Sequence, residues 1–285
     1  MYKTLSGKEV AGKITEELEK KIKEKGLAPV LGIVVIGEDK PSQVYVRKKC
    51  EKAAEIGVKA EVYKFPGSIS ENKLLEEVKK LNNDRKIDGF IVQTPIPKHI
   101  DTNMVIETID PKKDVDGYTS INMGKVMQNI VDGETFWPAT PLGVMKMLEF
   151  YKIELEGKKA VVIGRGNTVG KPLAMMLLHK NATVTLCHSK TRNLAEHTTN
   201  ADVILAAAGS PKLITGKMVK EGATVIDIGT TRVMVDGKEK VVGDVVFDEV
   251  IKKANCSPVP GGVGPLTVAM LLANTMKAAD RNKKR

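Results

Sequence analysis

The sequence is poor in cysteine, in aromatic residues and in long apolar runs. Its three cysteines (Cys50, Cys187 and Cys256) are far apart and lack CxxC spacing, so we expect no disulfide framework, and a reducing cytoplasm. Aromatic residues make up 4% of the chain, which leaves few rings for stacking on nucleic-acid bases. No apolar run can span a bilayer, and the first residues lack a signal-peptide core. We expect neither a membrane partner nor a metal site.

The charge balance is basic, with 45 Lys+Arg against 35 Asp+Glu and a net charge of +10. Such a chain binds either nucleic acid or small anions such as nucleotide phosphates and carboxylated substrates. Most lysines alternate with glutamates on helical stretches, which is typical of a solvated face. Only residues 281–285 form a dense basic cluster. Nucleic acid is therefore the weaker alternative, and we expect no such partner.

The 285 residues alternate between helical and strand patterns, which predicts parallel sheets and the α/β class. Apolar runs at 31–37, 58–65 and 89–93 predict the strands of a first domain, and residues 110–138 are predicted to be rich in loops. A second series of strands is predicted at 160–164, 183–188, 202–206 and 223–227. We expect two α/β domains with a cleft between them: residues 1–138, completed by a helix over 266–285, and a Rossmann-like domain over 139–265.

The densest glycine and proline segment is 260–267, Pro-Gly-Gly-Val-Gly-Pro-Leu-Thr, directly before a strongly apolar helical pattern. Glycine allows a ligand to approach the backbone, and proline fixes φ. The segment suits a rigid wall for a flat ligand with polar edges. It suits equally a plain tight loop before a helix.

A second segment, Gly164 to Gly170, follows a buried type of strand and precedes a helix. Its glycines permit a tight turn and the close approach of a pyrophosphate at a helix N-terminus. The spacing is GxGxxxG instead of GxGxxG, and a tight turn without a ligand is the alternative. The strand, loop and helix context favours a dinucleotide site.

The next strand ends at His188-Ser189-Lys190, where an NAD site usually has an acid for the ribose hydroxyl. No acid is present here. Ser189, Lys190 and Arg165 suit a 2′-phosphate, which favours NADP over NAD. For Ser189 alone, capping of a helix that begins near Thr191 is an equally good interpretation.

Three further segments carry polar groups suited to catalysis. Tyr45 and Lys49 are spaced to share one helix face, where a ring beside an ammonium can stack on a flat substrate and polarise it. Gln93 and Thr94 follow a predicted parallel strand, beyond whose end ligands bind. Asp116 could accept from an amino-pyrimidine edge. A half-buried ring beside a solvated lysine, a polar strand end and a plain Asp-Gly turn are the structural alternatives.

In this order the segments resemble one family, the bifunctional methylenetetrahydrofolate dehydrogenase/cyclohydrolases. The resemblance covers nearly the whole chain and is carried by 45–49, 92–97, 114–117, 138–141, 164–172 and 258–267. It implies NADP-dependent oxidation of 5,10-methylenetetrahydrofolate to the methenyl form, and hydrolysis of that form to 10-formyltetrahydrofolate. It also implies a role in one-carbon metabolism and purine biosynthesis, and a homodimer paired through the cofactor domain.

The resemblance also implies roles for residues. Lys49 is similar to the cyclohydrolase lysine, Gln93 to the residue that tunes it, Tyr45 to the stacking ring and Asp116 to the pterin anchor. The further expected substrate contacts are Val92, Thr94, Pro260, Gly261 and Gly264. The expected cofactor contacts are Thr140, Gly164, Arg165, Gly166, Val169, Gly170, Ser189 and Thr230.

Four places depart from the usual pattern of the family. Gly166 stands where serine is common, Thr94 where an aliphatic residue is common, and Ala139 where cysteine is common; Thr230-Thr231 replaces Ile-Asn. Lys49, Gln93 and Asp116 are all present, so both activities are expected. Two alternatives stay open: another NADP-dependent two-domain dehydrogenase, which would need no tetrahydrofolate, and a basic nucleic-acid-binding module, whose affinity would fall steeply with salt.

Overall fold

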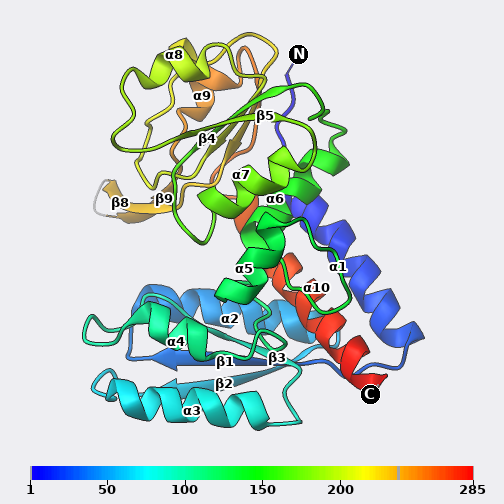
Figure 1. Ribbon diagram of the computed structural model, residues 1–285. Coiled ribbons are helices and arrows are strands. Elements are labelled where there is room, and N and C mark those ends of the chain that lie inside the picture. Colours follow the sequence, from blue (N-terminus) through cyan, green and yellow to red (C-terminus); the bar gives the residue numbers. More distant parts are fainter. Residues whose placement is uncertain (1, 236–237, 285) are drawn as a thin grey trace. The chain divides into compact units, whose positions relative to one another are not determined.

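The computed structural model describes residues 2–235 and 238–284 (Figure 1). The chain divides into two compact units, each with its own parallel sheet. We call residues 13–139 and 268–285 the three-stranded unit, and residues 1–12 and 140–267 the five-stranded unit. The predicted domain boundaries at 138 and 265 stay predictions. Residues 1–12 pack with the five-stranded unit, where Leu5 N donates to Cys256 O at 2.9 Å.

The three-stranded unit has the sheet order β2-β1-β3, with every pair parallel. Figure 1 shows α2 and α3 on opposite sides of this sheet. Its core joins the sheet to α3 and α4 through buried aliphatic side chains such as Val34, Leu74 and Val105. The elements are α1 (Gly7–Glu24, which starts in the other unit), β1 (Val30–Ile36), α2 (Lys40–Glu55), β2 (Lys59–Phe65), α3 (Glu71–Asn83), β3 (Gly89–Val92), α4 (Thr102–Thr108) and α5 (Ser120–Met127).

The five-stranded unit has the parallel order β10-β7-β6-β4-β5. The antiparallel pair β8 and β9 lies outside this sheet. The Asp236-Gly237 dipeptide, a sequence signal that predicts a hairpin turn, falls outside the described residues. The elements are α6 (Ala139–Phe150), β4 (Lys159–Ile163), α7 (Gly170–Leu178), β5 (Thr183–Cys187), α8 (Leu194–Thr198), β6 (Val203–Ala206), a 3₁₀ turn η1 (Gly216–Met218), β7 (Thr224–Asp227), β8 (Thr231–Val235), β9 (Lys238–Val242), α9 (Phe247–Val250), β10 (Asn255–Cys256) and α10 (Val263–Lys283, which ends in the other unit).

The α/β class and the parallel sheets are confirmed, because continuous apolar runs formed buried strands in both units. The stretch 110–138, predicted to be rich in loops, contains one helix among its loops and turns. Helix α5 lies inside this stretch, and the Thr119 side chain caps it by accepting from Asn122 N at 3.4 Å. Among the described helices, none has the length and apolar character needed to cross a membrane.

Strand order in the five-stranded sheet identifies a switch point. From β4 the chain moves outward to β5 at one edge, then returns to β6 on the other side of β4. In open parallel sheets, ligands bind beyond the carboxyl ends of the two strands at such a reversal. The loops that follow β4 and β6 therefore flank the position where a ligand is expected in this unit.

Candidate active site

Lys49 and Gln93 are brought together in the three-stranded unit. Lys49, in the last half of α2, donates from Nζ to Oε1 of Gln93 at 2.9 Å. Gln93 directly follows β3, and its backbone N donates to Val34 O of β1 at 2.9 Å. The Gln93 amide nitrogen donates to Thr94 O at 2.7 Å, which directs the amide oxygen at the lysine. The end of the sheet thus orients the ammonium of a helix residue.

Asp116 is the third member of this group. Burial lowers the pKa of Lys49 from its ordinary value, while the negative charge of Asp116 opposes that change. Burial raises the pKa of Asp116 to about 6, opposed by Lys49 and reinforced by the like charge of Asp114. Both side chains are half-buried. The arrangement supplies an amine that loses its proton more readily than a free lysine, beside a carboxyl group that titrates close to neutrality.

The other substrate residues predicted in this unit lie close in sequence to Lys49 or Gln93. Tyr45 precedes Lys49 by four residues in α2 and is 39% exposed, so part of its ring is open to a ligand. Val92 ends β3 and is half-buried, whereas Thr94 is exposed. The group therefore combines a ring, an amine, an amide and a carboxyl group within one unit.

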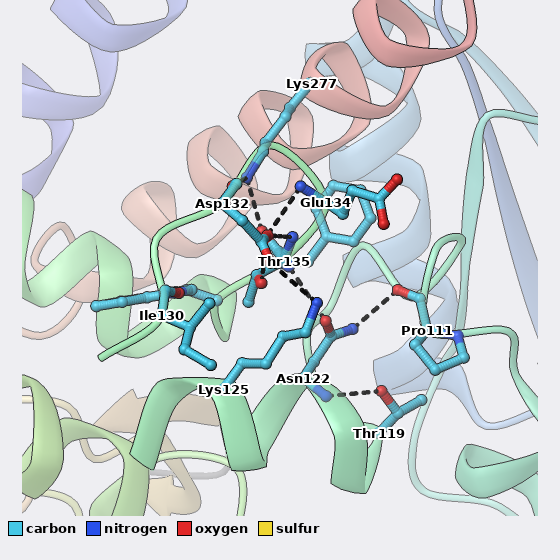
Figure 2. Close-up of polar contacts among 11 residues, drawn as sticks. Pro111, Thr119, Asn122, Lys125, Ile130, Asp132, Glu134, Thr135 and Lys277 are labelled. Carbon is cyan, nitrogen blue, oxygen red and sulfur yellow. Dashed lines mark hydrogen bonds and ion pairs between the residues drawn. The ribbon is translucent and has the colours of Figure 1, made fainter. Parts of the chain in front are cut away.

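A buried carboxylate that the sequence analysis did not single out fixes the loop of Asp116. Asp114 is 1% exposed and accepts from Gly117 N at 2.9 Å, Thr119 N at 2.8 Å and Asn122 Nδ2 at 2.9 Å. Asn122 also donates to Pro111 O at 3.0 Å, as Figure 2 shows. The Asp-x-Asp-Gly motif could have predicted this role for Asp114, because an Asp side chain commonly accepts from backbone N–H groups of the turn that follows it.

Helix α10 supports the same loop from the C-terminal part of the chain. Asn274 is 6% exposed, and its side-chain amide donates to Val115 O at 2.8 Å and to Trp137 O at 3.0 Å. Val115 lies between the two acids. The backbone of the Asp116 loop is thus held from both sides, by Asp114 and by Asn274.

A second polar cluster in this unit orders the chain after α5 (Figure 2). Asp132 accepts from the Thr135 hydroxyl at 2.6 Å and from Lys125 Nζ at 3.1 Å, and these bonds lower its pKa. Lys277 of α10 donates to the carbonyl oxygens of Asp132 and Thr135 at 3.0 and 2.7 Å. A cavity of about 440 Å³ adjoins the cluster, lined by Gly133, Glu134, Lys277, Asp280, Arg281 and Lys284. None of the predicted site residues lines it.

The predicted cofactor loop lies between β4 and α7 in the five-stranded unit. Gly164 has φ +118°, and a Cβ there would lie 2.1 Å from Ala207 O in the loop after β6. A Cβ on Gly170 would lie 1.8 Å from Gly164 O, so the loop packs against the start of α7. Val169 precedes α7 and provides no side-chain cap, and Gly166 is open to solvent. A helix start without a side-chain cap, directly behind a glycine turn, fits a pyrophosphate through the helix dipole.

The groups expected at the 2′-phosphate are accessible. Arg165, Ser189 and Lys190 are all exposed. The alternative for Ser189 was wrong: α8 begins at Leu194, preceded by Asn193, so Ser189 does not cap it. A tight turn displaced the expected start of this helix, because Thr191 N donates to His188 O at 2.8 Å.

The remaining predicted cofactor residues also belong to the five-stranded unit. The Thr140 and Thr267 hydroxyls are 2.9 Å apart and hydrogen bonded, which joins α6 to α10. Thr230 follows β7 and is exposed. The loop at 207–209 carries no distinctive motif in the sequence, although it follows the buried strand β6 at the switch point.

The glycine-rich segment is in the five-stranded unit as well. Gly261 O accepts from the backbone N of Gly7 and of Lys8 at 3.0 and 3.1 Å, so the segment packs against the start of α1. The last helix begins at Val263, earlier than the predicted Leu266, because Gly264 and Pro265 fit within its first turn. Pro260 and Gly264 are exposed and Gly261 is half-buried. The segment thus has a packing role on one side and an accessible surface.

Fold and site together define a class: an α/β enzyme of two units, with a dinucleotide-binding type of sheet in one and a lysine-centred site in the other. Within the described residues, no group of His, Cys, Asp or Glu is arranged to hold a metal. The NAD(P)-binding domain of tetrahydrofolate dehydrogenase/cyclohydrolase matches residues 138–283, and the catalytic domain of that family matches residues 5–116. The chain belongs to the tetrahydrofolate dehydrogenase/cyclohydrolase family.

Individual relatives agree with this family over the full length. The chain is 49% identical over 281 residues to the bifunctional protein FolD of Moorella thermoacetica, covering 97% of this chain and 98% of that protein. The solved FolD of Campylobacter jejuni is 44% identical with a TM-score of 0.94, covering 99% of both chains. The Trypanosoma brucei methylenetetrahydrofolate dehydrogenase-cyclohydrolase, solved with NADP and an inhibitor, is 36% identical with a TM-score of 0.95, covering 100% of this chain and 99% of that one.

Proposed function

We propose that the protein oxidises 5,10-methylenetetrahydrofolate to 5,10-methenyltetrahydrofolate with NADP and hydrolyses the product to 10-formyltetrahydrofolate. Membership of the family supports both activities. The observation that carries the assignment is the half-buried Lys49 bonded to Gln93 at 2.9 Å beside a carboxyl group whose pKa is raised to about 6. A fully exposed lysine would keep its hydration and therefore its ordinary pKa.

For the oxidation, the residues of the five-stranded unit bind and orient the dinucleotide. The glycine turn at Gly164 and the uncapped start of α7 receive the pyrophosphate. Arg165 and Ser189 receive the 2′-phosphate, with Thr140 and Thr230 as further contacts. Bound NADP supplies the acceptor for the hydride that leaves the methylene carbon. The protein's own contribution to this step is the alignment of the two reacting groups.

For the hydrolysis, Lys49 manages the proton of the attacking water. Water adds to the amidinium carbon of the methenyl group, the bond from this carbon to N5 breaks, N5 gains a proton, and one proton is released overall. The lowered pKa of Lys49 increases the share of neutral amine that can accept the water proton. Gln93 holds the amine through its carbonyl oxygen, so it acts on the water indirectly.

Folate is held by the other residues of the group. Asp116 accepts from the amino edge of the pterin, Tyr45 stacks on the substrate, and Val92 and Thr94 contact it at the end of β3. Pro260, Gly261 and Gly264 add backbone contacts. In this proposal residues 1–138 with the helix 266–285 form the folate and catalytic domain, and residues 139–265 form the NADP domain.

The protein further acts as a cytoplasmic homodimer in one-carbon metabolism that feeds purine biosynthesis. Three cysteines present as free thiols support the reducing compartment. Pairing through the five-stranded unit is supported by two exposed leucines in it: Leu186 of the edge strand β5 is 37% exposed, and Leu178 of α7 is 50% exposed. Sedimentation at micromolar concentration tests the dimer, which Leu186→Lys should dissociate.

An absorbance assay tests the proposed activities. Methylenetetrahydrofolate is mixed with NADP or NAD, and the methenyl absorbance is followed as it rises and then decays. NADP should give the faster rise, and the decay should exceed the uncatalysed rate. No methenyl formation with either dinucleotide would reject the dehydrogenase assignment, and a preference for NAD would reject the 2′-phosphate argument.

A further inference from the structure

Two buried acids lie beneath the carboxyl end of the five-stranded sheet. Asp227 is the last residue of β7, and Asp244 follows β9. They are 3% and 0% exposed. Fully buried acids are rare unless hydrogen bonds hold them, so the partners of this pair indicate what the pair does.

Asp244 bonds the loop after β6. Its Oδ2 accepts from Ala208 N at 2.7 Å and from Gly209 N at 3.0 Å. The preceding residue, Ala207, is the one whose carbonyl oxygen packs against Gly164. Asp244 thus holds, from a position 36 residues away, the loop against which the glycine turn lies.

Asp227 holds Asp244 in place. Its Oδ1 accepts from Asp244 N at 2.9 Å and from Gly229 N at 3.0 Å, and its Oδ2 accepts from Val245 N at 3.0 Å. A Cβ on Gly229 would lie 2.4 Å from the Asp244 carboxyl carbon, and one on Gly243 would lie 1.8 Å from Asp227 Oδ2. The loops after β6, β7 and β9 are therefore fastened together by two carboxyl groups.

Stability alone does not account for the acid at position 244. Its second oxygen, Oδ1, is buried and has no hydrogen-bond partner among the described residues. A buried polar atom without a hydrogen-bond partner destabilises the fold. Burial also raises the pKa of the neighbouring Asp227 to about 6 against the opposing backbone bonds, with the Asp244 charge adding to the rise. In return, Asp244 fixes the positions of Ala208 N and Gly209 N at the switch point.

We propose that Asp244 is a positioning residue for the dinucleotide: it fixes the loop at 207–209, the wall of the NADP site that faces the Gly164 turn across the switch point. This inference rests on the proposed function. A loop that is already ordered does not lose conformational entropy when NADP binds, so loss of this order should weaken NADP affinity.

The test compares Asp244→Ala, Asp244→Asn and Asp202→Ala by calorimetric titration with NADP⁺. Asp202 is the matched control, because it bonds Lys159 N at 2.8 Å and Lys220 at the amino ends of β4 and β6. We expect Asp244→Ala to weaken NADP⁺ binding about tenfold or more. Asparagine keeps an oxygen for both N–H groups, so Asp244→Asn should stay within about threefold of wild type, as should Asp202→Ala.

Cyclohydrolase activity is measured in parallel as the decay of methenyl absorbance, which requires no NADP. It should change less than about twofold in Asp244→Ala, because Lys49 belongs to the other unit. If Asp244→Ala does not fold, Asp244→Ser, whose hydroxyl is too short to reach both N–H groups, takes its place with the same expectation. Unchanged NADP⁺ affinity, or equal weakening by Asp202→Ala, overturns the inference. Absence of NADP⁺ binding by the wild type would reject the proposed function instead.

Discussion

Replacing Asp114 by alanine should destabilise the three-stranded unit and weaken folate binding together. The change removes the acceptor of three donors: Gly117 N, Thr119 N and Asn122 Nδ2. Gly117 N keeps the backbone oxygen of residue 114 at 3.1 Å, but Thr119 N and Asn122 Nδ2 lose this acceptor. Each buried donor left without a partner costs about 1–3 kcal/mol, so we expect a total loss of about 2–6 kcal/mol. Because Asp116 lies in the same turn, its carboxyl group should lose its fixed position.

The assay is urea unfolding with a folate titration on the same variants. Asp114→Asn keeps at least one acceptor, so it should lose about half as much stability as the alanine variant. Asp101→Ala is the control in the same unit, because this exposed cap of α4 bonds Asn103 N and Met104 N. Asp101→Ala should lower the free energy of unfolding by about 1 kcal/mol and leave folate affinity unchanged. Equal stability of Asp114→Ala and Asp101→Ala would refute the role of the buried carboxylate.

Three further predictions follow from the site. Asp116→Asn should weaken folate binding yet raise the free energy of unfolding at pH 8 by about 1–3 kcal/mol. Because the pKa of the Asp116 carboxyl is raised from 3.8 to about 6, its stabilising contribution is present below pH 4 and is lost as pH rises through 6. Urea unfolding at pH 8 and pH 4 should therefore show a gain in stability only at pH 8. Gly164→Ala should lower the free energy of unfolding by on the order of 3 kcal/mol, because φ is +118° and the added Cβ would meet Ala207 O. Gly166→Ala has open space around the added Cβ, so it should leave the thermal unfolding temperature nearly unchanged. Arg165→Ala should reduce the NADP to NAD ratio of kcat/KM, and an unchanged ratio would remove Arg165 from the 2′-phosphate site.

The strands were predictable because each is marked by a short apolar run within its own residues. The run at 31–37 is apolar throughout and bounded by proline and charged residues, and β1 occupies Val30–Ile36. The cap of α3 is equally local, because Ser70 accepts from Lys73 N at 3.3 Å, three residues along the chain. Short elements were not predictable, since a helix of eight residues such as α5 has too few turns to show a periodicity.

The supporting residues of the site could not be found from the sequence alone. Asn274 meets Val115 across 159 residues, and Asp244 meets Ala208 across 36. Their partners are backbone groups, which carry no residue-specific signal. Lys49, Gln93 and Asp116, in contrast, stood in recognisable segments, and the structure joins them through one hydrogen bond and opposed charges.

The most direct test of the account measures both reactions in Lys49→Ala. Methylenetetrahydrofolate and NADP are supplied, and the rise and decay of methenyl absorbance are recorded against wild type. We expect methenyl to accumulate and to decay at the uncatalysed rate, because hydride transfer suffers less than hydrolysis when the amine is gone. An equal loss of both rates in a variant that unfolds at the wild-type temperature would contradict the assignment of Lys49 to the hydrolysis.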